Sequence, residues 1–254
     1  MLRALVALIA SMTVLTSNGA DERTLTRYLD GLSGDLSVSV RELSTGFSYT
    51  YNRGLRTATA SIVKVNIVMA LLLKRRRLSD WEKRAAARAI KVSDNAAASA
   101  LWSAIGGAAG LAAANKRLGL RETRPGSAWG ATTTSAADQV RLLNALVSPK
   151  SPLPAEHRAY MLRLMGDVAP EQAWGVSAAG RAELKNGWLP RARDGGRWTV
   201  NSIGRVRDGG RTYLIAVISK GNTSMGAGVK AIEHVARAVC SCAGVARHAG
   251  RVCR

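Results

Sequence analysis

The sequence predicts an α+β fold in which strands from both ends of the chain form one antiparallel sheet beside a helical lobe. Apolar and polar residues alternate at 36–43 and 47–51, and three further strand-like segments lie at 182–188, 198–206 and 212–219. Such alternation is typical of strands with one buried face. The chain between the two groups is rich in alanine and has helical periodicity. Strands and helices that are segregated along the chain indicate an α+β architecture.

The N-terminal segment has the pattern of a secretory signal peptide. Arg3 supplies a positive charge, residues 4–15 are apolar, and residues 16–20 are small or polar. No later apolar run approaches the ~20 residues that are needed to cross a bilayer. We therefore expect a signal peptide over residues 1–20 and a soluble, secreted mature protein, with a buried N-terminal helix as the alternative.

One domain is expected over residues 21–245, followed by a C-terminal tail at 246–254. Its strand lobe comprises 24–60 and 180–240, and its helical lobe comprises 61–179. The helix that begins the helical lobe is apolar on every face, which predicts that it is buried in the centre of the protein. The expected helices are 24–32, 61–73, 79–90, 95–105, 110–118, 135–147, 155–165 and 224–239.

The chain is strongly basic, with a formal net charge of +20 from 37 Lys and Arg against 17 Asp and Glu. These cations are spread along the chain, apart from one tight run at residues 74–77. They are not interleaved with aromatic residues and form no nucleic-acid motif, so we expect no nucleic-acid partner. Electrostatic attraction to an anionic cell envelope is physically reasonable for such a charge.

Three cysteines, Cys240, Cys242 and Cys253, lie near the C-terminus. An exported protein can form disulfides, and Cys253 could pair with either Cys240 or Cys242, which leaves the pairing open. Only His248 is nearby, and the C-x-C spacing lacks the usual C-x₂-C pattern of a zinc site. We expect neither a metal nor another cofactor.

A serine and a lysine lie one helical turn apart at Ser61 and Lys64. Residues three apart share one face of a helix, so the amine can reach the hydroxyl. A serine hydroxyl becomes a good nucleophile only when a nearby base accepts its proton, and a lysine held neutral by burial can be that base. The pair is a candidate nucleophile and base, although this tetrapeptide pattern also occurs by chance.

Two further motifs follow in the order Ser93-Asp94-Asn95 and Lys185-Asn186-Gly187. The first opens a predicted helix, where the same residue types also serve as ordinary caps. The second lies on the first C-terminal strand, where a glycine would let a ligand approach the backbone closely.

Taken together, the three ordered motifs resemble the S-x-x-K, S-D-N and K-T-G signature of class A β-lactamases and penicillin-binding proteins. The resemblance extends from about Thr24 to Ala243 and implies the fold of that superfamily, an antiparallel sheet packed with an all-helical lobe. The segment between the Ser61 helix and Ser93 is shorter than in class A enzymes, which implies a trimmed helical lobe and a more open cleft.

The resemblance also implies roles for the motif residues. Ser61 would attack a carbonyl carbon and become acylated, with Lys64 as a candidate base. Ser93 would relay a proton to the leaving nitrogen, and Lys185 would tune that site electrostatically. The backbone N–H groups of Ser61 and Trp188 would stabilise the oxyanion.

Substrate contacts are implied at a second set of residues. Asn95 would hydrogen-bond an amide of the substrate, and Gly187 belongs to the third motif. Asn186 replaces the usual Thr or Ser there, and its amide can still donate to a substrate carboxylate. Arg197 is a candidate partner for the same carboxylate or simply a solvated charge of a hairpin.

The loop that carries the deacylating Glu of class A β-lactamases is shortened here. No Asp or Glu occurs between Glu122 and Asp138, and Glu122 precedes the Thr123-Arg124 pair, whereas the catalytic Glu of the family follows that pair. Either Glu122 is repositioned or the deacylation base is absent, and absence is the favoured interpretation.

We therefore expect a monomeric, exported serine hydrolase that forms an acyl-enzyme with a β-lactam or a related amide or ester. Two alternatives remain open: a D-alanyl peptidase-like enzyme acting on cell-wall peptides, and a penicillin- or peptidoglycan-binding protein without turnover. They differ in how fast the acyl group leaves Ser61.

Overall fold

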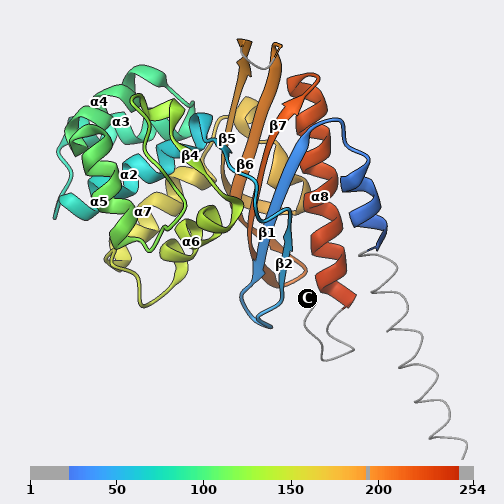
Figure 1. Ribbon diagram of the computed structural model, residues 1–254. Coiled ribbons are helices and arrows are strands. Elements are labelled where there is room, and N and C mark those ends of the chain that lie inside the picture. Colours follow the sequence, from blue (N-terminus) through green and yellow to red (C-terminus); the bar gives the residue numbers. More distant parts are fainter. Residues whose placement is uncertain (1–22, 193–194, 246–254) are drawn as a thin grey trace, which may run out of the picture.

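The computed structural model describes residues 23–192 and 195–245, of which the side chains of 242–245 are not described. Figure 1 shows a central sheet with a helical lobe on one face and a long C-terminal helix on the other. The predicted α+β fold is confirmed. The predicted signal peptide, the C-terminal tail and the side chains of Cys242 and Cys253 lie outside the described residues, whereas Cys240 is buried.

The main sheet has five antiparallel strands in the order β2-β1-β7-β6-β5. Strands from both ends of the chain thus meet where β1 pairs with β7. The strands are β1 (Asp35–Glu42), β2 (Ser48–Tyr51), β5 (Arg181–Arg191), β6 (Arg197–Asp208) and β7 (Arg211–Asn222). The strand β5, which carries the third motif, lies at the edge of the sheet that adjoins the helical lobe.

A second sheet of two short strands was not predicted. It pairs β3 (Thr57–Ala58) with β4 (Thr133–Thr134) and joins the segment before Ser61 to the segment after the shortened loop. Two-residue strands carry no detectable alternation, so only the tertiary pairing defines them.

The predicted helices are all present, and three of them begin or end at other residues than predicted. A helix at 23–30 precedes β1, α5 begins at Gly107 and α8 continues to Val245. The remaining boundaries agree to within about two residues, as assignments usually do. The helices are α2 (Val63–Lys74), α3 (Asp80–Lys91), α4 (Asn95–Ile105), α5 (Gly107–Arg117), α6 (Ala136–Val147), α7 (Ala155–Gly166) and α8 (Met225–Val245).

Helix α2 is the centre of the helical lobe. All its residues from Val63 to Leu72 are buried, and it contacts α3, α4, α5 and α7. A helix with apolar side chains on every face removes them all from water only if other elements surround it. The sequence prediction of a central helix is therefore confirmed.

Strand β7 is buried on both faces. Leu214 and Ile218 pack into the core shared with the helical lobe, whereas Tyr213 and Ile215 pack into the core beneath α8. The sheet is therefore covered on both sides, which fixes the position of β5 and β6 relative to α2.

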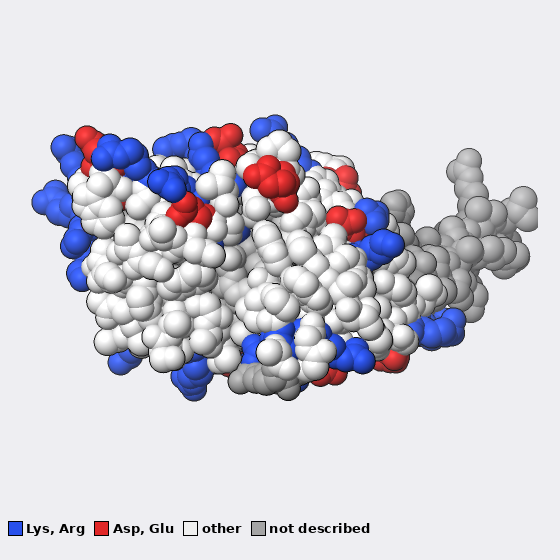
Figure 2. Space-filling model, turned by 90° about the horizontal axis from the view of Figure 1, so that it is seen from above, with Lys and Arg blue, Asp and Glu red and all other residues white. Residues whose placement is uncertain are grey.

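Among the described residues, no single helix has the length and apolarity to cross a membrane, and only the pair α4 and α5, bent by 77°, meets those criteria together. Seen from above, Lys and Arg gather around the margin of the molecule, and the centre of this face carries few charges (Figure 2).

Candidate active site

Ser61 lies in a 3₁₀ turn, η1 (Ala60–Ile62), that leads directly into α2. The residue before it, Ala60, has a φ of 48°, a left-handed conformation that side chains other than glycine rarely adopt. Such strain persists only where the surroundings hold it, and it concentrates at functional sites. Here the Thr59 N–H donates to Thr132 O at 2.7 Å, which ties the turn to the shortened loop.

The sheet holds the same turn from the other side through Asn201 of β6. This fully buried side chain donates from Nδ2 to Ala58 O at 2.9 Å and to Thr59 O at 3.0 Å. Its Oδ1 accepts the Ser219 N–H at 3.1 Å. Sequence analysis missed Asn201, because an asparagine within a strand carries no motif.

Gly187 lets β5 pass directly against the Ser61 turn. A Cβ atom at this position would lie 2.6 Å from Ser61 N, 2.7 Å from Ile62 N and 2.9 Å from Thr59 O. These distances are shorter than any side chain tolerates. The sequence predicted that a ligand would approach this glycine, but it is the chain's own backbone that comes close.

Ser93 connects the two motif lysines. Its Oγ lies 3.1 Å from Lys64 Nζ and 3.0 Å from Lys185 Nζ. Lys64 Nζ also donates to Ser93 O at 2.6 Å and to Asn95 Oδ1 at 2.8 Å, and Lys185 Nζ donates to Asn186 O at 2.8 Å. Ser93 has a φ of 57°, which makes it a second residue in a strained conformation. The structure therefore brings the three motifs together, with the Lys64 amine directed at Ser93 and Asn95.

Both lysines are almost completely buried. Burial lowers the pKa of Lys64 to about 8, although the negative charge of Asp94 opposes this shift. Burial and, to a smaller extent, the neighbouring charge of Lys64 together lower the pKa of Lys185 to about 7. A sizeable fraction of neutral amine therefore exists near neutral pH, as proton transfer requires.

Asp94 and Asn95 begin α4. The Asp94 carboxylate accepts the Ala97 N–H at 2.7 Å and pairs with Arg88 at 2.5 Å, so it acts as the helix cap that the sequence predicted as an alternative. Asn95 is exposed and lines the pocket next to Ser61.

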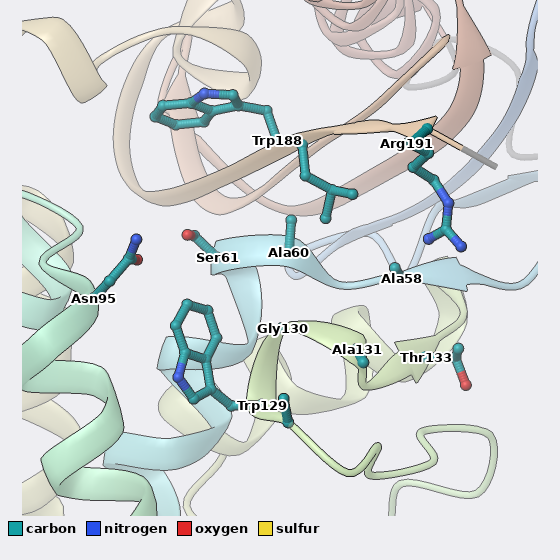
Figure 3. Close-up of a pocket in the computed structure, with 13 residues that line it drawn as sticks. Ala58, Ala60, Ser61, Asn95, Trp129, Gly130, Ala131, Thr133, Trp188 and Arg191 are labelled. Atoms are coloured by element: carbon teal, nitrogen blue, oxygen red, sulfur yellow. The ribbon is translucent and has the colours of Figure 1, made fainter. Parts of the chain in front are cut away.

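A pocket of about 1000 Å³ lies between the lobes beside Ser61. Figure 3 shows Ser61 between Asn95 and the indole of Trp129, with Trp188 and Arg191 of β5 across the opening. The lining residues are Ala58, Ala60, Ser61, Asn95, Ala128, Trp129, Gly130, Ala131, Thr133, Trp188, Leu189, Arg191 and Ala192.

Trp129 lines this pocket and lies close to Lys64. Its ring centroid lies 5.0 Å from Lys64 Nζ, and its Nε1 donates to Ser99 Oγ at 3.1 Å, which fixes the orientation of the ring. The sequence offered no signal for this residue except its place in the shortened loop.

Two predicted substrate contacts need correction. Asn186 is fully buried, and its Nδ2 donates to Gln172 O and Trp174 O, each at 2.9 Å, so the amide is not available to a carboxylate in the pocket. Arg197 is exposed and donates to Gly221 O of β7 at 3.0 Å. Because β5 runs three residues beyond its predicted end, it is Arg191 that lines the pocket instead.

No Asp or Glu lines this pocket among the described residues. Glu122 forms an ion pair with Arg56 and accepts the Ser135 hydroxyl at 2.5 Å. Asp138 accepts the backbone N–H groups of Arg121 and Glu122 at 3.1 and 2.7 Å. Both carboxylates stabilise the shortened loop. Nor does any group of three or more His, Cys, Asp or Glu within the described ranges form a candidate metal site.

The comparison with family models identifies the chain. A model described as "Beta-lactamase enzyme family" matches residues 82–242, more than half of the sequence. The chain belongs to the beta-lactamase enzyme family. The fold of this chain matches the crystal structure of the TLA-1 extended-spectrum beta-lactamase, with a TM-score of 0.78 at 15% identity over 89% of this chain and 99% of that one.

Another solved structure and a relative in sequence are also similar to this chain. The acyl-enzyme of a PBP-A point mutant with penicillin G has a TM-score of 0.76 at 18% identity, covering 89% of this chain and 97% of that one. In sequence, "Putative lipoprotein LppW" of Mycobacterium tuberculosis is 29% identical over 212 residues, which cover 78% of this chain and 67% of that protein.

Replacing Gly187 with alanine tests the close contact in this beta-lactamase family member. We expect Gly187→Ala to lower the free energy of unfolding by about 1–3 kcal/mol, the usual cost of overpacking, because the new methyl group meets backbone on three sides. Gly54→Ala is the matched control, since its Cβ meets nothing within 4 Å. Equal midpoints for the two variants in urea unfolding would contradict the proposed contact.

Proposed function

We propose that this protein is an exported serine hydrolase that forms an acyl-enzyme on Ser61 with a β-lactam or a related amide or ester. The observation that carries this proposal is the placement of Ser93 Oγ between Lys64 Nζ and Lys185 Nζ at 3.1 and 3.0 Å, beside a pocket that Ser61 lines. A hydroxyl held by two buried amines of lowered pKa can pass protons in either direction.

The reaction begins with attack of Ser61 Oγ on the carbonyl carbon of the substrate. The hydroxyl proton goes to neutral Lys64, the C–N bond breaks, and the leaving nitrogen takes a proton from Ser93 Oγ, which regains one from a lysine ammonium. The N–H groups of Ser61 and Trp188 stabilise the oxyanion, and the absence of a side chain at Gly187 lets these strand and turn backbones approach each other. Asn95 and Arg191 position the substrate.

Release of the acyl group is expected to be slow. Water attacks an acyl-enzyme efficiently only when a base accepts its proton, and no carboxylate lines the described pocket. Trp129 also covers the space next to Lys64. These observations favour a penicillin-binding protein of low turnover, or an enzyme acting on cell-wall peptides, over an efficient β-lactamase.

Export to the cell envelope fits this function. The N-terminal pattern of a signal peptide and the similarity to a relative named as a lipoprotein support export. The net charge of +20 would hold the protein near anionic envelope components.

Benzylpenicillin tests the acylation directly. Intact-mass spectrometry is expected to detect one covalent adduct on the wild-type protein and none on Ser61→Ala, with peptide mapping placing the adduct on Ser61. An adduct that persists for hours supports slow deacylation, whereas rapid release with nitrocefin turnover supports a β-lactamase. Failure of both adduct formation and ester cleavage would remove the proposal.

The pH dependence of acylation tests the role of the lysines. Since the proton acceptor must be neutral, the acylation rate should rise between about pH 6 and pH 9, with an apparent pKa of the coupled pair near the values of about 7 and about 8 for Lys185 and Lys64. Stopped-flow measurement with nitrocefin gives this profile. A rate that still increases steeply above pH 10 would mean that the lysines keep their ordinary pKa values.

Asn201 is expected to position the Ser61 turn. Asn201→Ala leaves two backbone carbonyls without their donor and should lower both stability, by about 1–3 kcal/mol, and the acylation rate, by about 10- to 100-fold. Asn222→Ala is the matched control, because Asn222 is also buried and donates to Trp198 O and Ser219 Oγ but not to the turn. It should lose stability and keep its acylation rate. Equal loss of rate in both variants would assign Asn201 a purely structural role.

A further inference from the structure

The basic run at residues 74–77 divides into two parts with different surroundings. Lys74 Nζ donates to Ala104 O at 3.1 Å, and Arg75 Nε pairs with Glu82 Oε1 at 2.9 Å. These two cations stabilise helix ends and the turn between α2 and α3. Arg76 and Arg77 are exposed and form no ion pair with any described residue. Two adjacent cations without an internal partner are available to an external anion.

Arg76 and Arg77 line a second pocket, of about 760 Å³, on the helical lobe. Lys83 of α3, whose Nζ pairs with Asp80 Oδ1 at 3.2 Å, adds a third cation, and Glu156 of α7 is the one carboxylate among the lining residues. The floor is apolar, formed by Leu72 and Leu78. This pocket shares no lining residue with the pocket beside Ser61, so it is a separate site.

A largely buried histidine on α7 also lines this pocket. His157 lines this pocket and is only 8% exposed, yet its Nδ1 has no hydrogen-bond partner among the described residues. Buried polar atoms are normally paired. Beside it, the Tyr160 hydroxyl donates weakly to Lys83 O at 3.4 Å, so it can turn to a stronger acceptor.

We propose that this pocket binds a phosphate group attached to an apolar moiety. The planar guanidinium groups of Arg76 and Arg77 match the oxygens of a phosphate in a forked arrangement, and Lys83 adds a point charge. Tyr160 and the apolar floor accept the moiety that carries the phosphate. The ligand is either a soluble phosphate ester or the headgroup of an anionic phospholipid, which share this chemistry.

Binding to the full-length protein tests the site with phenyl phosphate, a phosphate monoester with an apolar ring. Titration at constant ionic strength, followed by NMR signals of the His157 ring, should be saturable. The double variant Arg76→Gln with Arg77→Gln should bind at least tenfold more weakly. The control removes two exposed arginines elsewhere, by Arg27→Gln with Arg181→Gln, and should bind within twofold of wild type. Glu156→Gln should bind more tightly, because it removes the repelling carboxylate.

Vesicles of phosphatidylcholine with and without phosphatidylglycerol distinguish the two ligand sources. Cosedimentation that depends on phosphatidylglycerol and on Arg76 and Arg77 identifies a lipid headgroup, whereas phenyl phosphate binding without such cosedimentation identifies a soluble ester. The proposal is overturned if phenyl phosphate shows no saturable binding and cosedimentation with vesicles does not depend on phosphatidylglycerol. It is also overturned if the control double variant loses as much affinity as Arg76→Gln with Arg77→Gln. Acylation of Ser61 by benzylpenicillin should be unchanged in every variant, which also verifies the fold.

Discussion

The contact of strand β5 with the turn that carries Ser61 is the constraint on which the rest of the site depends. At Gly187 the two backbones are so close that a single methyl group would lie 2.6 Å from the Ser61 nitrogen. This approach sets the distance between the sheet and α2, and thereby the position of every residue in the pocket. Asn201, on the neighbouring strand and opposite Gly187 in register, holds the turn through two hydrogen bonds. These contacts hold the residues on either side of Ala60 in place, and they can thereby maintain its left-handed backbone conformation.

The second constraint on the site is the burial of its two lysines, Lys64 and Lys185. Burial of an ammonium group is costly unless hydrogen bonds replace its water, and here Ser93, Asn95 and backbone carbonyls supply those bonds. The part of the burial penalty that these bonds do not offset disfavours the charged form and so lowers the pKa of both lysines. A serine between two buried amines contributes little to the stability of the fold, because apolar side chains could fill the same volume without burying charged groups. Its placement is the geometry that the proposed proton transfer requires.

The shortened loop brings no described carboxylate to the pocket beside Ser61. Glu122 of the loop and Asp138 of α6 are paired with arginines and backbone N–H groups, and the ring centroid of Trp129 lies 5.0 Å from Lys64 Nζ. The loop thus forms one side of the pocket beside Ser61 without bringing a carboxylate base to it. Under the proposed function, a loop without a base at the serine is expected to slow the release of the acyl group.

The sequence by itself determined the fold class, most of the helices and strands, and the set of motif residues that meet at Ser93. These features follow from periodicity and from short motifs, which are local properties of the chain. Tertiary structure alone decided that Asn186 points away from the pocket, that Arg191 rather than Arg197 lines it, and that Asn201 and Trp129 surround the serine turn. Each of these depends on where a strand ends or on which distant segment packs against it. Contacts between residues far apart in sequence leave no periodic signal, so only the packed structure reveals them.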